Sequence, residues 1–300
     1  MNGTIISEEP QWSRHLKFYI FTSIQLPSVC VAVYILYRFY YSTKIHSRLH
    51  YHSLLTLLTI AFLELITELP LTLQFLYSGR VRPASSWFCL VWIWYNCSLH
   101  SMNLFLMAWT SIERHILIFH SHLLQSSQQK FQRHYLPIIF SLFYIPLFYF
   151  ICIFVYSCEN TFDYTIILCG SICYNNLPWL AAFDWIAHIC VPSSIIPVAS
   201  IILLIRVVIQ RKKMARTLNW KTIRKLTLQL MFISSLYSIF WVSYALVIVI
   251  RLYFIPTFLT VIINYYFFYS PYFVQLFMPF LCLICLPELW RQKLRVVPLI

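Results

Sequence analysis

The sequence predicts an all-α membrane protein, a bundle of seven helices that cross the bilayer with the N-terminus outside the cell. Three observations lead to this fold class. The composition is strongly apolar, seven apolar stretches are long enough to cross a membrane, and basic residues collect in alternate connecting segments.

The composition excludes an ordinary soluble domain. Of the 300 residues, 60% are hydrophobic and 10% are charged, whereas soluble domains carry about 25% charged residues. A water-soluble core cannot hide so much apolar surface, so the bilayer is the expected solvent. Residues 1–12 are polar and hold two acids, which does not resemble a cleavable signal peptide. The first apolar stretch is therefore expected to remain as a membrane span.

Each apolar stretch reaches the roughly 20 residues that a helix needs to cross the hydrocarbon core. The stretches cover 16–41, 53–77, 86–112, 135–157, 180–209, 226–250 and 256–285. Proline interrupts the fifth and the seventh, which membrane helices tolerate because neighbouring groups satisfy the freed backbone; these residues are Pro192, Pro197, Pro271 and Pro279.

The distribution of Lys and Arg predicts the orientation, because cytoplasmic segments carry an excess of both. With the N-terminus outside, only five of the 22 basic residues lie on the outer side: Arg14, Lys17, Arg80, Arg82 and Arg251. The net charge of +13 is thus explained by the membrane, and no nucleic-acid partner is expected. A glycosylation sequon at Asn2 agrees with an outer N-terminus at the plasma membrane.

One domain is expected over residues 1–300, with a short extracellular segment at 1–15 and a short cytoplasmic segment at 286–300. The sequence shows no internal repeat. This disfavours a transporter built from two related halves.

The third stretch ends in three adjacent polar residues, Glu113, Arg114 and His115, here called the triplet. Charge inside a bilayer is costly and often functional. The alternative is an interfacial arginine that extends its charged head into water.

A cysteine marks the other end of the same stretch. Cys89 precedes Arg114 by 25 residues, which corresponds to about 37 Å of α-helix, roughly one membrane thickness. Cys89 is therefore expected on the oxidising outer side. The loop between the fourth and fifth stretches lies on that side and holds Cys158, Cys169 and Cys173. The sequence alone leaves the pairing open.

These features together resemble the rhodopsin-like (class A) family of G-protein-coupled receptors over residues 16–295, in the form of a divergent orphan receptor of the invertebrate type. The triplet resembles the Asp/Glu-Arg-Tyr motif of that family, and Cys89 lies at the spacing of its third-span cysteine. Trp241 resembles the sixth-span toggle tryptophan, and Pro279 resembles the seventh-span proline. Residues 287–291 resemble the start of a short amphipathic eighth helix.

The resemblance implies a receptor that binds an extracellular ligand and moves the inner end of span six outward. Glu113, Arg114 and His115 would then form the switch that couples to a heterotrimeric G protein. It also implies that Cys89 pairs with Cys173 or Cys169, because the loop cysteine of the family lies towards span five.

The chain departs from the family pattern in the last two spans. The seventh-span motif keeps Pro279 but lacks its asparagine and tyrosine, and Ser243 stands where a kinking proline is expected. The inner end of span six carries Arg224 and Lys225 where family members often hold an acid. Like charges cannot hold Arg114, so Glu113 remains as its evident partner.

A polar switch core is expected in the middle of the bundle. Glu64 and Glu68 share a helix face through their i, i+4 spacing and should point into the bundle. Glu64 resembles the second-span acid that helps bind sodium in the family, and Asn103 lies where a polar partner of that ion is expected. The alternative is a protonated Glu64 that is only hydrogen-bonded. No other cofactor and no metal site are expected.

The ligand is expected to differ from a simple cationic amine, because Asn96 stands where amine receptors of the family carry an aspartate. Aromatic residues near the outer mouth could line a pocket with Asn96 or belong to the interfacial aromatic belt; the candidates are Trp92, Tyr95, Trp179 and Trp185.

The segment 206–225 is basic and without acids. Positive-inside anchoring explains it, and contact with anionic lipid or with a G protein could add to this.

Two other classes of function remain as alternatives. Glu64 and Glu68 could serve an ion path in a channel or transporter. Histidines cluster in the inner segments, as in membrane desaturases, but the paired histidines of such enzymes are missing, so no enzymatic activity and no catalytic residue are expected. These histidines are His46, His50, His52, His115, His120 and His122.

Overall fold

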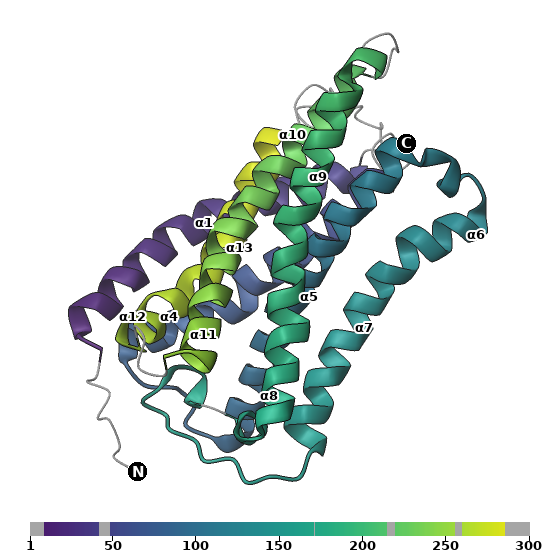
Figure 1. The fold of residues 1–300 in the computed structure, drawn as a ribbon. Coiled ribbons are helices and arrows are strands. Elements are labelled where there is room, and N and C mark those ends of the chain that lie inside the picture. Colours follow the sequence, from purple (N-terminus) through teal and green to yellow (C-terminus); the bar gives the residue numbers. More distant parts are fainter. Residues whose placement is uncertain (1–8, 42–48, 171, 215–219, 256–259, 286–300) are drawn as a thin grey trace, which may run out of the picture.

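The computed structural model describes residues 9–41, 49–170, 172–214, 220–255 and 260–285. These residues form helices and connecting loops, and no strand occurs among them. The long helices run side by side along the length of the molecule (Figure 1). The sequon at Asn2 and the expected eighth helix at 287–291 lie outside the described residues.

The helices follow one another in seven groups. The first three groups are α1 (Gln11–Tyr41); α3 (Leu49–Leu63), η1 (Glu64–Glu68) and α4 (Leu69–Ser78); and α5 (Ser86–Phe119). After the short elements η2 (Ser121–Leu124) and α6 (Ser127–Lys130), the fourth group is η3 (Phe131–Tyr135), α7 (Leu136–Phe150) and η4 (Ile151–Val155). The loop elements η5 (Ile167–Cys169) and η6 (Cys173–Asn176) precede the fifth group, which is α8 (Pro178–Asp184), η7 (Trp185–Cys190) and α9 (Val191–Met214). The sixth group is α10 (Trp220–Tyr237), η8 (Ser238–Val242) and α11 (Ser243–Tyr253), and the last is α12 (Thr260–Tyr265), η9 (Phe267–Tyr269) and α13 (Ser270–Cys285).

Six helical groups of the described chain are long and apolar enough to cross a membrane. The helix α5, expected as the third span, is the one predicted span that is not among them. The reason is its position. Because α5 packs against α3, α7, α9 and α10, much of its surface faces protein rather than lipid, and it buries polar side chains such as Asn96, His100 and Asn103.

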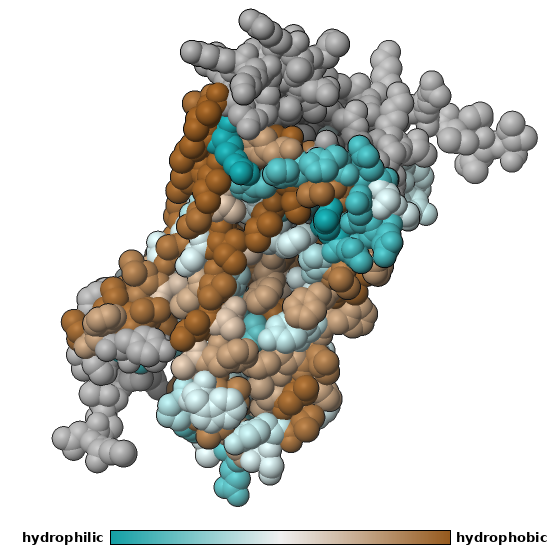
Figure 2. All heavy atoms as spheres, turned by 45° about the vertical axis from the view of Figure 1, so that its right-hand side comes forward, coloured by the Kyte–Doolittle hydropathy of each residue, from teal (hydrophilic) through white to brown (hydrophobic). Residues whose placement is uncertain are grey.

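The outer surface of the bundle is apolar where a soluble protein would be polar. Phe143 on α7 is 73% exposed, and Val208 on α9 is 61% exposed. Figure 2 shows hydrophobic side chains along the length of the molecule, with hydrophilic ones gathered towards its upper part. This inversion is expected of helices whose outer faces contact lipid.

Proline explains three of the wide π-helical turns. The turns η1, η3 and η7 each end two residues before a proline, namely Pro70, Pro137 and Pro192. Proline donates no backbone hydrogen bond and clashes with the carbonyl four residues earlier. The helix accommodates both effects by widening one turn.

A wide turn also occurs in the sixth group, where the expected proline is replaced by Ser243. Here η8 covers Ser238–Val242, directly before Ser243. The hydroxyl of Ser270 in α13 donates to the carbonyl oxygen of Phe240 at 3.4 Å. The helix is thus irregular at the expected position, and a neighbouring helix supports the freed backbone.

Two disulfide bonds close one end of the bundle, the lower end in Figure 1, here called the disulfide end. Cys89 at the start of α5 is joined to Cys169, the second of the two expected partners. Cys173, the other expected partner, is joined to Cys158 within the loop. The opposite end, which holds Glu113 and Arg114, is called the triplet end.

Candidate functional site

The triplet lies inside α5, which continues to Phe119. Glu113 is 1% exposed and Arg114 is 5% exposed. Such burial argues against an arginine that merely reaches the membrane surface. Arg114 interacts electrostatically with Glu113 and Tyr51, and the ring of half-buried His115 lies 2.8 Å from the carbonyl oxygen of Ala199 in α9.

The carboxylate of Glu113 joins three helices. It accepts a hydrogen bond from the hydroxyl of Ser53 in α3, and its other oxygen pairs with the ring of His134 in η3. His134 is completely buried. Sequence reasoning missed this residue, and the only signal for it was a histidine three residues before Pro137, at the start of an apolar stretch.

A second polar group, the core cluster, surrounds Glu68 in the middle of the bundle. One oxygen of Glu68, Oε1, accepts hydrogen bonds from Asn96 at 2.8 Å, Tyr272 at 2.9 Å, Thr72 at 3.1 Å and Trp92 at 3.2 Å. These side chains come from α4, α5 and α13. Four donors on one oxygen hold Glu68 in a single orientation.

Glu64 lies four residues earlier, at the start of the same π turn. Glu64 and Glu68 are both 0% exposed. The Nδ1 atom of His100 lies 2.9 Å from Oε1 of Glu64. The ring of His100 also packs edge-on against Tyr272 at 5.0 Å and Trp241 at 5.9 Å between centroids.

Asn103, the expected partner of Glu64, is engaged elsewhere. Its amide nitrogen donates to Gln275 at 3.4 Å, and its oxygen accepts a hydrogen bond from Tyr237. The side chain that meets Glu64 is His100. The expected pair is therefore replaced by a cluster of Glu64, Glu68 and His100.

A third polar group centres on Asp184 in α8. Its carboxylate accepts hydrogen bonds from Tyr149 at 2.9 Å and Tyr174 at 3.0 Å, and the ring of His188 lies at 2.8 Å. Ser101 in α5 lies 2.9 Å from the Tyr149 hydroxyl. The group ties α5, α7 and the fifth group together near the disulfide end.

The expected ligand-pocket residues do not converge on one cavity. Trp92 and Asn96 bind Glu68 and are buried. The hydroxyl of Tyr95 instead lies 2.9 Å from that of Thr67 on the exposed side of η1.

The two remaining tryptophans lie apart from these. Trp179 is 67% exposed at the start of α8. Trp185 packs against the ring of Tyr244 in α11, with 5.8 Å between centroids. The position of Trp179 fits the aromatic belt, whereas Trp185 joins the fifth and sixth groups.

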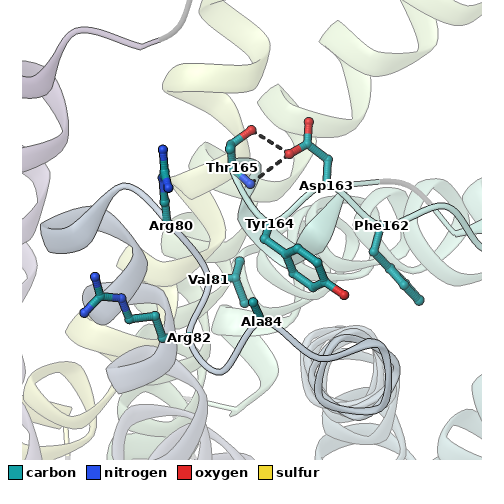
Figure 3. A pocket seen from close by; sticks show the side chains of 8 residues that line it. All are labelled: Arg80, Val81, Arg82, Ala84, Phe162, Asp163, Tyr164 and Thr165. Atoms are coloured by element: carbon teal, nitrogen blue, oxygen red, sulfur yellow. Dashed lines mark hydrogen bonds between the residues drawn. The ribbon is translucent and has the colours of Figure 1, made fainter.

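A hollow of about 540 Å³ lies at the disulfide end, between two loops. Figure 3 shows its lining: Arg80, Val81, Arg82, Ala84, Phe162, Asp163, Tyr164 and Thr165. Two hydrogen bonds from Thr165 hold the carboxylate of Asp163 and keep the pKa of Asp163 below its ordinary value. The side chains are mostly exposed, so the hollow is a shallow surface feature.

Comparisons with known proteins identify the fold. No protein-family model and no curated protein matches the sequence. The crystal structure of squid rhodopsin superposes with a TM-score of 0.73 and covers 95% of this chain and 85% of its own, at 17% identity. This chain has the rhodopsin fold. With its six apolar helices, it is a multi-pass membrane protein.

Proposed function

We propose that the protein is a divergent class A G-protein-coupled receptor of the orphan type. It crosses the plasma membrane seven times, with α5 as its third span and its N-terminus outside. The observation that carries the proposal is α5 itself: one end is tied by a disulfide bond to the loop between η4 and α8, and the other buries an acid-arginine pair.

We take the described arrangement to be the resting state of the receptor. Glu113 links α5 to α3 and η3 through Ser53 and His134. Tyr237 links α10 to α5 through Asn103. Ligand binding at the disulfide end shifts the balance between two states of the bundle, and α10 moves away from α5 at the triplet end.

The G protein would dock at the triplet end, where the opening exposes Arg114. The basic residues of segment 206–225 would add attraction to the acidic surface of a partner and to anionic lipid. The ligand itself is not a simple amine, because Asn96 is neutral and its amide is bound to Glu68 and Tyr272.

The proposal is tested with G-protein dissociation sensors for each Gα class in cells. Glu113→Gln weakens the links to Ser53 and His134 and should raise the basal signal. Arg114→Ala should abolish that signal at equal surface expression. Glu159→Gln, the same chemical change at an exposed loop position, is the matched control and should behave as wild type.

If Glu113→Gln does not raise the basal signal with any Gα class, at normal surface expression, coupling to G proteins would be contradicted. Ion flux through the purified protein in liposomes would then favour the alternative, a channel or transporter. The observation behind that alternative is the pair of buried carboxylates at Glu64 and Glu68.

A further inference from the structure

Glu68, at the centre of the core cluster, forms a second cluster with Glu64 and His100, and these three side chains are arranged as metal ligands. One ligand atom from each of Glu64, Glu68 and His100 lies within 4.8 Å of the others. The two acids come from the π turn η1, and the histidine comes from α5. All three side chains are buried, with His100 the most accessible at 8% exposed.

Oε2 of Glu64 and Oε2 of Glu68 are buried and have no hydrogen-bond partner among the described residues. Oε1 of Glu64 and Nδ1 of His100 pair with each other at 2.9 Å. Buried polar atoms in proteins are almost always satisfied, and each exception calls for an explanation such as an ion. Here two such oxygens, one on each glutamate, lie in a cluster with His100.

The hydrogen bonds to one oxygen of Glu68 fix the position of its other oxygen. Oε1 is held by Asn96, Tyr272, Thr72 and Trp92, so Oε2 is the oxygen left free for a metal ion. Supporting hydrogen bonds of this kind orient metal ligands in known sites.

The charge balance also favours a cation. Two carboxylates share the cluster, and the four side chains bound to Glu68 are neutral. Without a metal ion, the cluster is neutral only if one carboxyl group is protonated and His100 is charged. A divalent ion would balance both carboxylates and leave His100 neutral, as ligation requires.

From these observations we propose that Glu64, Glu68 and His100 bind a divalent transition-metal ion, best matched by Zn²⁺. Two carboxylates and one imidazole are a three-ligand set that leaves one position open for water. Imidazole suits zinc and is not a preferred ligand of sodium, magnesium or calcium. The 2.9 Å between His100 and Glu64 is close to the roughly 3.3 Å that separates two ligands on a tetrahedral zinc ion with bonds of about 2.0 Å.

Zinc at this position would regulate the bundle. It would tie the second helical group to α5 and fix the ring of His100 against Trp241 and Tyr272. Those residues belong to η8 and α13, so the ion would stabilise the described arrangement of four helical groups. This inference does not depend on G-protein coupling, because metal binding is measured on the purified chain alone.

The test uses the full chain in detergent, stripped with a chelator, in a background that carries His120→Gln and His122→Gln. That background removes a pair of neighbouring surface histidines whose rings lie 5.9 Å apart. Zinc is titrated against a fluorescent competitor, and thermal unfolding is recorded in parallel. We expect one zinc ion per chain and a higher Tm with zinc than without.

His100→Gln and Glu64→Gln should each weaken zinc binding by more than about 100-fold, because loss of a ligand exceeds the 10- to 100-fold effect of a supporting residue. His188→Gln is the matched control, since His188 is also buried beside a carboxylate, and it should bind zinc as the background does. Equal binding by His100→Gln, or equal loss in His188→Gln, would overturn the proposal.

Zinc X-ray absorption on the His120→Gln, His122→Gln background itself covers the case in which a further variant fails to fold. We expect nitrogen and oxygen ligands with one imidazole and no sulfur. Sulfur ligands would place the metal at free cysteines instead. A rise in Tm with sodium but not with zinc would show a monovalent site and would also refute the proposal.

Discussion

At the scale of single residues, burial and partners decide what each acid does. Glu113, Glu68 and Asp184 are all buried, yet each has a different set of partners. A buried charge is tolerated only where hydrogen bonds or opposite charge compensate for lost hydration. The sequence placed Glu68 and Glu113 in the expected second and third spans. It could not show their partners on other helices, because a local sequence pattern does not determine how one helix is rotated against another.

The pairing of Glu113 with His134 gives a first prediction. His134→Leu leaves the Glu113 carboxylate buried with Ser53 as its remaining neutral partner, and breaking such a pair costs about 3–5 kcal/mol. The double variant His134→Leu, Glu113→Gln should recover part of that loss, since residue 113 then carries no charge for His134 to compensate. Thermal unfolding of the four proteins in detergent measures this coupling. Additive changes in Tm would mean that the two side chains do not interact.

Glu68 gives a second prediction at this scale, measured without metal. Glu68→Gln keeps an acceptor oxygen for Asn96, Trp92 and Tyr272 and should lower Tm only slightly. Glu68→Ala removes the acceptor and leaves buried donors unsatisfied, each at about 1–3 kcal/mol. If both variants unfold at the same temperature, the hydrogen bonds to Glu68 contribute nothing to stability.

At the scale of helices, the π turns place the functional side chains. The sequence predicted where the apolar stretches lie and noted the prolines at Pro192 and Pro197. It did not predict the wide turns that end before Pro70, Pro137 and Pro192, although proline chemistry explains them. The π turn η1 carries both Glu64 and Glu68. This wide turn and the rotation of α5 about its axis together bring His100, rather than Asn103, to Glu64.

The link between α10 and α5 gives a prediction about helix motion. Tyr237 lies near the end of α10, and its hydroxyl donates to Asn103 in α5. Tyr237→Phe keeps the ring and removes this bond, so α10 should separate more easily and the basal G-protein signal should rise. Ser235→Ala is the control, because the Ser235 hydroxyl bonds only within its own helix. A basal signal equal to that of wild type would mean that this bond does not restrain α10.

At the scale of the whole molecule, the alternation of apolar and basic segments predicts the bundle, and the rhodopsin fold agrees with it. The expected third span, α5, is the exception, because it is not among the helices that are apolar enough to cross a membrane. The central helix α5 is surrounded by other helices and can therefore afford polar residues on several faces. Hydropathy predicts how well a helix surface suits lipid. It is therefore least informative about a membrane span when the neighbours of that helix are other helices.

The two disulfide bonds give a prediction at this scale. The disulfide bond Cys89–Cys169 joins residues 80 positions apart in the sequence, and Cys158–Cys173 joins residues 15 positions apart. The chain-entropy model gives about 3 kcal/mol for a 15-residue loop and about 4.7 kcal/mol for a 100-residue loop. Replacing Cys89 and Cys169 by serine should therefore lower Tm more than replacing Cys158 and Cys173. Peptide mapping without reduction checks the pairing itself, and a Cys89–Cys173 peptide would contradict it.

The most direct test of the receptor mechanism is a distance measured across the triplet end. Spin labels are placed at Gln128 in α6 and Leu228 in α10, both exposed. Cys30, Cys97, Cys190 and Cys285 are replaced first. Pulsed electron spin resonance then compares the purified protein with and without a nucleotide-free G protein of the class found by the sensors. We expect a second, longer distance with the G protein, because α10 moves outward. An unchanged distance in a sample where the G protein is shown to be bound would contradict it.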